Sequence, residues 1–112
     1  AGDAQTSHRQ TLVALHTNSS LIRSKQNRWE DSSSHATKAL LIEPDNVKAL
    51  FRRGVAKQQQ NRLTDAVKDL QRALELAPND KRVRKALSAT LKKLKLKKAS
   101  STGKAFGKGG LF

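Results

Sequence analysis

The sequence repeats itself at an offset of 34 residues, and this feature limits the possible folds more than any other. Asn27 recurs as Asn61, and Pro44 recurs as Pro78. Each proline follows an amphipathic stretch by a few residues, where its ring cannot continue a helix. Repeats of this length are supersecondary units that bury their apolar faces by stacking on their neighbours. We therefore expect a stacked array of similar units.

The units are predicted to be helical. Only two prolines and six glycines are present, and the strong helix formers Ala, Leu, Lys, Arg and Gln are abundant. Apolar residues recur at helical spacing throughout the array. The predicted fold class is all-α, a solenoid of antiparallel helix pairs closed by a C-terminal capping helix. Its helices are expected at 9–25, 29–42, 46–59, 62–76 and 80–98.

The apolar spacing also predicts which helix faces are buried. On the first helix the predicted face holds Leu12, Leu15 and Ile22, with Ser19 between them. The fourth and fifth helices have longer apolar faces, formed by Leu63, Ala66, Leu70, Ala73 and Leu74 and by Val83, Leu87, Leu91 and Leu94. Two pairs of residues, Asp45-Asn46 and Asn79-Asp80, follow the prolines, and their short side chains are expected to cap free backbone amides of the helices that follow.

The chain is expected to form one domain. Residues 9–98 hold the two repeats and the capping helix. Residues 1–8 and the Gly-, Ser- and Lys-rich tail at 99–112 lack the periodic pattern, and we predict that both are disordered.

The chain has 23 basic and 9 acidic residues, a formal charge of +14, which predicts an acidic partner such as nucleic acid, an anionic membrane surface or an acidic peptide. The absence of cysteine excludes disulfide scaffolds, cysteine-based zinc sites and thiol catalysis. No apolar run approaches the roughly 18 residues that span a bilayer, and the first residues lack the apolar centre of a signal peptide. These features favour a soluble protein of the cytoplasm.

No catalytic constellation is evident, so we predict a module without enzyme activity, metal or cofactor. The histidines His8, His16 and His35 have no metal-ligand spacing, and they are interpreted as surface or loop-packing residues. The glycines near Lys108 lack the sequence context of a phosphate-binding loop.

Over residues 10–98 the sequence resembles the tetratricopeptide-repeat family. The family's landmark positions are occupied in the second repeat by Gly54, Ala66, Leu70, Ala73 and Pro78. The strings LHTNSSL and VKALFRRGVA are similar to the C-terminal repeat domains of large FK506-binding immunophilins and related heat-shock co-chaperones. This resemblance implies a protein-interaction module.

In the proteins it resembles, these strings carry part of a carboxylate clamp that grips the C-terminal Glu-Glu-Val-Asp of heat-shock chaperones. The corresponding residues here are Asn18, Lys48 and Arg52. Their spacing supports this independently, because Lys48 and Arg52 lie one helical turn apart and Asn18 precedes Arg52 by one repeat of 34. Arg53 should point elsewhere. The simpler alternative is that Lys48 and Arg52 are ordinary solvated charges.

The resemblance also has limits. A complete clamp uses three units, and the first is expected to be absent from this chain. Either the chain is a piece of a longer protein, or the protein has a shortened array and an incomplete clamp. Any isomerase domain would also lie outside it. With two units and a closing helix, the chain is expected to be a monomer of marginal stability.

A basic patch on the last predicted helix offers a second interpretation, a helical scaffold that binds RNA, calmodulin or anionic lipid. The patch consists of Lys92, Lys93, Lys95, Lys97 and Lys98. Calmodulin is suggested by the resemblance, because large immunophilins carry a calmodulin-binding segment at this place. Nucleic acid ranks below the peptide, because no aromatic residues alternate with these lysines. A solubilising capping helix ranks first among the roles of this segment.

Overall fold

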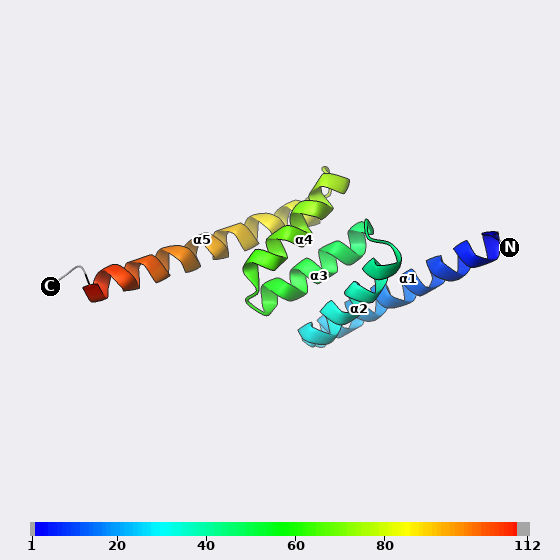
Figure 1. The fold of residues 1–112 in the computed structure, drawn as a ribbon, viewed down its shortest axis with the longest axis horizontal. Coiled ribbons are helices and arrows are strands. Elements are labelled where there is room, and N and C mark those ends of the chain that lie inside the picture. The colour runs from blue at the N-terminus through cyan, green and yellow to red at the C-terminus, as the bar shows by residue number, and fades with distance from the viewer. Residues whose placement is uncertain (1, 110–112) are drawn as a thin grey trace.

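The computed structural model describes residues 2–109, and their side chains from 4 to 100. It confirms the predicted all-α fold (Figure 1). The helices are α1 (Gly2–Lys25), α2 (Trp29–Ile42), α3 (Val47–Gln59), α4 (Leu63–Leu76) and α5 (Lys81–Gly109). We call the pair α1 and α2 unit 1, and the pair α3 and α4 unit 2.

The helices stack in chain order into an elongated body of 73 × 28 × 20 Å (Figure 1). Each helix packs against the next one along the chain, and α1 also contacts α3, which in turn contacts α5. The first helices of successive units therefore form one layer, which we call the inner layer. Because α2 and α4 make no comparable contact within the described chain, they form the more widely spaced outer layer.

The turn inside each unit depends on an asparagine. Asn27 has a φ of 59° and Asn61 a φ of 63°, the left-handed conformation that asparagine adopts more readily than most residues. After each asparagine, a backbone N–H donates back to the last turn of the helix, from Arg28 to Arg23 at 2.9 Å and from Arg62 to Lys57 at 2.8 Å. The repeated asparagine in the sequence is therefore a helix-ending signal.

The second residue of each predicted capping pair forms a cap, Asn46 in the first pair and Asp80 in the second. The Asn46 side chain accepts a hydrogen bond from the backbone N–H of Ala49 at 2.8 Å, at the start of α3. Asp80 accepts from the N–H groups of Arg82 and Val83 at 3.0 and 3.3 Å, at the start of α5. Each cap fixes where an inner-layer helix begins.

The predicted buried face is confirmed for α4 and wrong for α1. On α4, Leu70 is fully buried, as are the smaller alanines of the same face. On α1, Leu15 and Ile22 are more than half exposed. The residues of α1 that are buried instead are Val13, Thr17 and Ser20. Small hydroxyl side chains line the contact between α1 and α2, because their size lets the two helices approach closely. The Ser20 and Ser32 hydroxyls form hydrogen bonds across this contact.

Both ends of the helical body differ from the prediction. Helix α1 begins at Gly2 and α5 continues to Gly109, whereas residues 1–8 and 99–112 were expected to be disordered. The early part of α1 contacts the end of α2, where the Arg9 guanidinium donates to the Ile42 carbonyl at 2.8 Å. Residues 1 and 110–112 lie outside the described residues. Disorder of the two ends in solution stays a prediction.

Candidate peptide-binding surface

The three residues predicted to bind a carboxylate all lie on the inner layer. Asn18 is exposed on α1, while α3 carries the exposed Lys48 and the half-buried Arg52. Lys48 and Arg52 are one turn apart and share a face of α3. Asn18 occupies on α1 the position that Arg52 occupies on α3, and the two helices are in direct contact. The structure thus places these residues on two adjacent helices of one layer.

Arg52 has no anionic partner within the described residues. Its Nε atom is buried and makes no hydrogen bond there. Burial lowers the pKa of Arg52 from its ordinary value, and the positive charge of Arg82 lowers it further. Both effects disfavour the charged guanidinium. An anion that reached this surface would therefore relieve an electrostatic cost that the protein already carries.

Arg82 is a further cation near this surface, and the sequence did not single it out. Its guanidinium carbon lies 5.4 Å from the centre of the Phe51 ring, which is the distance of a cation–π contact. The repeat offset could have identified it, because Arg82 follows Lys48 by 34 residues. A hollow of about 330 Å³ lies beside it between α3 and α5, lined by Phe51, Gln58, Arg82, Lys85, Ala86 and Ala89.

Arg53, the neighbour of Arg52, points elsewhere, as predicted. It donates two hydrogen bonds to the Asp69 carboxylate, each at 2.8 Å, and a third to the Thr37 hydroxyl at 3.3 Å. Lys57 approaches the same carboxylate to 3.1 Å. Asp69 is 6% exposed, so this cluster links α3 to α4 inside unit 2. Two adjacent arginines therefore have different roles, one structural and one facing the inner surface.

The five lysines of the predicted basic patch are all exposed on α5. Lys92 and Lys95 line a hollow between α4 and α5, and the C-terminal part of α5 extends away from the other helices (Figure 1). Residues 81–100 contain no aspartate or glutamate that could neutralise them. A role for this patch in binding stays a prediction.

The assignment of His16 and His35 to surface or loop positions is wrong. Their rings lie 5.8 Å apart between α1 and α2, and the Nδ1 atom of each is buried without a hydrogen-bond partner in the described structure. Burial lowers the pKa of His35, and the nearby cations of Lys38 and His16 lower it further. Helix packing brings these histidines together, and neither motif nor sequence spacing indicated it.

Within the described part of the chain, no group of three or more His, Asp or Glu side chains is arranged to hold a metal ion. None of the helices in this part combines the length and apolar character needed to cross a membrane.

The comparisons with known proteins agree with this architecture. The tetratricopeptide-repeat profile matches residues 47–80, which cover α3, α4 and the turn that follows. Rat sperm-associated antigen 1 is 36% identical over 84 residues, which are 75% of this chain and 9% of that protein. Drosophila melanogaster FK506-binding protein 59 is 34% identical over 83 residues, which are 74% of this chain and 19% of that protein.

A solved structure extends the likeness to three dimensions. The first repeat domain of Spaghetti (RPAP3), bound to the HSP90 peptide SRMEEVD, superposes with a TM-score of 0.71 at 28% identity, covering 73% of this chain and 65% of that one. The chain spans only a small part of the curated relatives named above. It is a tetratricopeptide-repeat domain that resembles the repeat regions of FK506-binding immunophilins and heat-shock co-chaperones.

Proposed function

We propose that the inner layer binds the free C-terminal carboxylates of an acidic peptide, with the Glu-Glu-Val-Asp end of a heat-shock chaperone as the ligand. Lys48 and Arg52 supply the positive charge, and the Asn18 amide donates a hydrogen bond beside them. The observation that carries this proposal is the buried, unpartnered Nε of Arg52. A buried donor of this kind is costly to leave unsatisfied, and a carboxylate supplies what it lacks.

The contrast with neighbouring cations supports this assignment. Arg53 and Lys57 are both held by Asp69, and Arg72 pairs with Asp45 and Glu75. Lys48 and Arg52 have no ion pair within the described residues. The chain thus neutralises the arginines that join its helices and leaves this inner pair available. The related domain bound to an HSP90 peptide supports the choice of ligand.

Arg82 extends the proposed site towards α5. It stands one repeat after Lys48, and its charge acts on Arg52. A peptide with glutamates before its terminal aspartate carries further carboxylates along its length. Arg82 is positioned to attract one of these, so the third inner-layer helix joins the binding surface. We assign isomerase activity and the full co-chaperone role to a longer protein that would contain this domain, and not to this domain alone.

The alternative is a basic scaffold for RNA, calmodulin or anionic lipid. It would use the exposed lysines of α5, which have no aromatic residue among them in residues 81–100. On the inner layer, Lys48 and Arg52 share one face of α3, and the Arg52 Nε is a buried donor with no hydrogen bond among the described residues. The lysines of α5 are all exposed to solvent. We therefore favour the peptide-binding function.

Calorimetric titration of the chain with a peptide that ends in Glu-Glu-Val-Asp tests the proposal. Amidation of the terminal carboxyl should weaken binding at least tenfold, because it removes a charge that Lys48 and Arg52 contact. Lys48→Ala and Arg52→Ala should each cost about 1.5–3 kcal/mol of binding free energy. Arg82→Ala should have a smaller effect, because it meets a charge further from the chain end.

Lys68→Ala is the matched control, because Lys68 is an exposed lysine of the outer helix α4. It should leave the affinity unchanged. Equal binding of the acid and amide peptides would exclude the clamp. So would equal losses in Lys48→Ala and Lys68→Ala, since general charge attraction would then explain the binding.

A further inference from the structure

In units 1 and 2, the second helix of the unit covers one face of the first helix. The equivalent face of α5 is exposed. In unit 1, Ser20 of α1 is fully buried against Ser32 of α2. In unit 2, Gly54 of α3 lies directly against Leu70 of α4. The residue 34 places after Gly54 is Ser88 of α5, which is exposed. Both units thus cover this face with their own second helix, and the described chain leaves it uncovered on α5.

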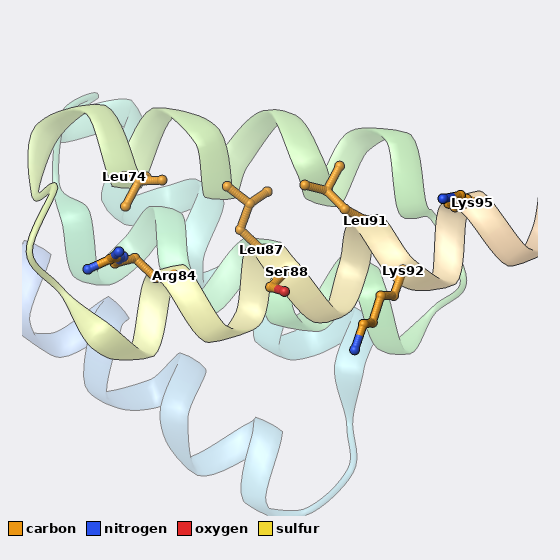
Figure 2. A pocket seen from close by; sticks show the side chains of 7 residues that line it. All are labelled: Leu74, Arg84, Leu87, Ser88, Leu91, Lys92 and Lys95. Carbon is orange, nitrogen blue, oxygen red and sulfur yellow. The ribbon is translucent and has the colours of Figure 1, made fainter.

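A groove runs along this open face, between α4 and α5 (Figure 2). It encloses about 410 Å³, and its apolar floor consists of Leu74, Leu87 and Leu91. Leu87 and Leu91 point towards α4, one helical turn apart (Figure 2). Leu87 is 8% exposed, while Leu91 is 43% exposed. The groove therefore offers a short apolar strip of the kind that receives the apolar side of a helix.

The repeat register shows how the chemistry of this face changes along the chain. Leu87 and Leu91 stand where α3 has Arg53 and Lys57. Those two cations grip Asp69 of the covering helix α4. Because α5 has leucines at these positions, a helix that covers it gains from apolar side chains rather than from a buried carboxylate.

The edges of the groove are positively charged. Arg84, Lys92 and Lys95 line it, with Arg84 near Leu74 and Lys95 at the far end (Figure 2). None of these side chains forms an ion pair with another residue among 4–100. Helix α5 holds no acidic residue of its own. A ligand that brings carboxylates to the rims of the apolar strip therefore complements this surface.

We propose that this groove is a second interaction surface, separate from the surface of Asn18, Lys48 and Arg52, and that it receives an amphipathic helix of an acidic partner protein. The partner's apolar side chains pack on Leu74, Leu87 and Leu91, and its carboxylates meet the cations at the edges. A helix is the fitting shape, because a helix covers the equivalent face in both units. A second copy of this chain does not fit, because two molecules of charge +14 repel each other.

Residues 81–109 do not supply such a ligand themselves, because α5 continues away from the groove (Figure 1) and holds no acidic residue. RNA would leave the apolar strip uncovered. These observations favour a protein ligand with both an apolar and an acidic face.

A synthetic helix tests the proposal directly. The probe is a fluorescently labelled peptide of about 18 residues, with leucine at every third or fourth position and glutamate on either side of that stripe. Its binding to the full chain is measured by fluorescence anisotropy. Leu91→Asp should weaken binding at least tenfold, whereas Leu96→Asp, at an exposed leucine outside the groove, should change it less than twofold.

Charge is tested with a matched pair of double variants. Lys92→Glu with Lys95→Glu should weaken binding much more than Lys93→Glu with Lys97→Glu, although the net charge changes equally. Circular dichroism checks that every variant stays helical. The Glu-Glu-Val-Asp peptide should bind the Leu91→Asp variant normally, which separates this proposal from the function proposed for the inner layer.

Four outcomes would overturn the proposal. Equal losses in the two double variants, or equal binding of a scrambled peptide, would reduce the effect to general charge attraction. Concentration-dependent dimerisation abolished by Leu91→Asp, seen in sedimentation without peptide binding, would assign the groove to a second copy. Binding to phosphatidylserine vesicles that depends on Leu96 as much as on Leu91 would assign the strip to a lipid surface.

Discussion

The two units have the same backbone design and fill their centres with opposite chemistry. In unit 1, Ser20 and Ser32 are fully buried, and each hydroxyl donates to the other residue's carbonyl, at 2.8 and 2.9 Å. In unit 2, the equivalent of Ser20 is Gly54, where an added Cβ would lie only 2.6 Å from Leu70 Cγ. Unit 1 is joined by hydrogen bonds and unit 2 by close apolar packing.

The contrast is reversed at the nearby position of Asp69, where unit 2 holds the polar cluster. Unit 2 places Asp69 between Arg53 and Lys57, whereas its equivalent in unit 1 is His35, beside His16 and with the Arg23 charge acting on it. A repeat fold thus fixes positions and leaves the interactions at those positions free to vary. The two units should consequently respond to different kinds of change, and the following predictions exploit that difference.

The largest effect is expected from Leu70→Ala. Leu70 is fully buried at the centre of unit 2, so its truncation should lower the free energy of unfolding by about 3–5 kcal/mol. A domain of this size has only about 5–10 kcal/mol of stability, so this variant should be close to unfolded at room temperature. Urea unfolding followed by circular dichroism measures the change. A loss below about 1 kcal/mol would show that unit 2 is not closely packed.

A double variant that gives unit 2 the residues of unit 1 at two equivalent positions, Gly54→Ser with Leu70→Ala, tests this prediction further. Gly54→Ser alone should cost about 1–3 kcal/mol, because its Cβ meets the Leu70 side chain. In the Leu70→Ala background the same change should cost much less, because unit 1 combines Ser20 with Ala36 at the positions equivalent to Gly54 and Leu70. Additive losses in the double variant would contradict a direct contact between these two positions.

The second effect is expected from Asp69→Asn. This change leaves the half-buried Arg53 and Lys57 facing a neutral amide, which should cost about 2–3 kcal/mol of unfolding free energy. The control is Asp65→Asn, since Asp65 forms only an exposed pair with Arg62 and should lose well under about 1 kcal/mol. Similar losses for both aspartates would show that burial does not distinguish the two ion pairs.

A smaller effect is expected in unit 1 from Ser20→Ala. The Ser32 hydroxyl keeps its bond to the backbone of residue 20, so only the bonds made by the Ser20 hydroxyl are lost. We expect a loss of about 1 kcal/mol in urea unfolding. Ser34→Ala, at an exposed position of α2, should be neutral. A loss as large as that of Leu70→Ala would mean that unit 1 depends on its polar contact as strongly as unit 2 depends on its packing.

The smallest effect is a dependence of stability on pH that originates in unit 1. Because burial lowers the pKa of folded His35 below the ordinary value of 6.5, the unfolded chain takes up its proton at a higher pH than the folded chain. The free energy of unfolding should therefore fall as the pH drops below 6.5 and level off below the folded pKa. His35→Gln should reduce this fall, as measured by thermal unfolding across that range. An unchanged profile would exclude His35 as the cause.

Most of the helix boundaries could be predicted from the sequence. The range 29–42 matches α2, and the limits of α3 and α4 differ from the predicted ones only by the capping residue at their start. Proline, asparagine and aspartate set these limits through their own backbone and side-chain chemistry, which acts within a few residues. The positions of Lys48 and Arg52 on one face of α3 follow from the same local geometry. The clamp itself stays a proposal.

The sequence by itself determined the repeat register, the limits of α2, α3 and α4, and the separation of Arg52 from Arg53. The register follows from the 34-residue pattern along the chain, and the other two follow from residues within a turn or two. Only the tertiary structure decided which face of α1 is buried, how His16 meets His35, and that Arg52 keeps an unpartnered Nε. Leu15 and Ile22 illustrate the reason. Apolar spacing identifies a face that can be buried, but burial depends on whether a neighbouring helix lies against it, and α2 packs on the hydroxyl-bearing face instead.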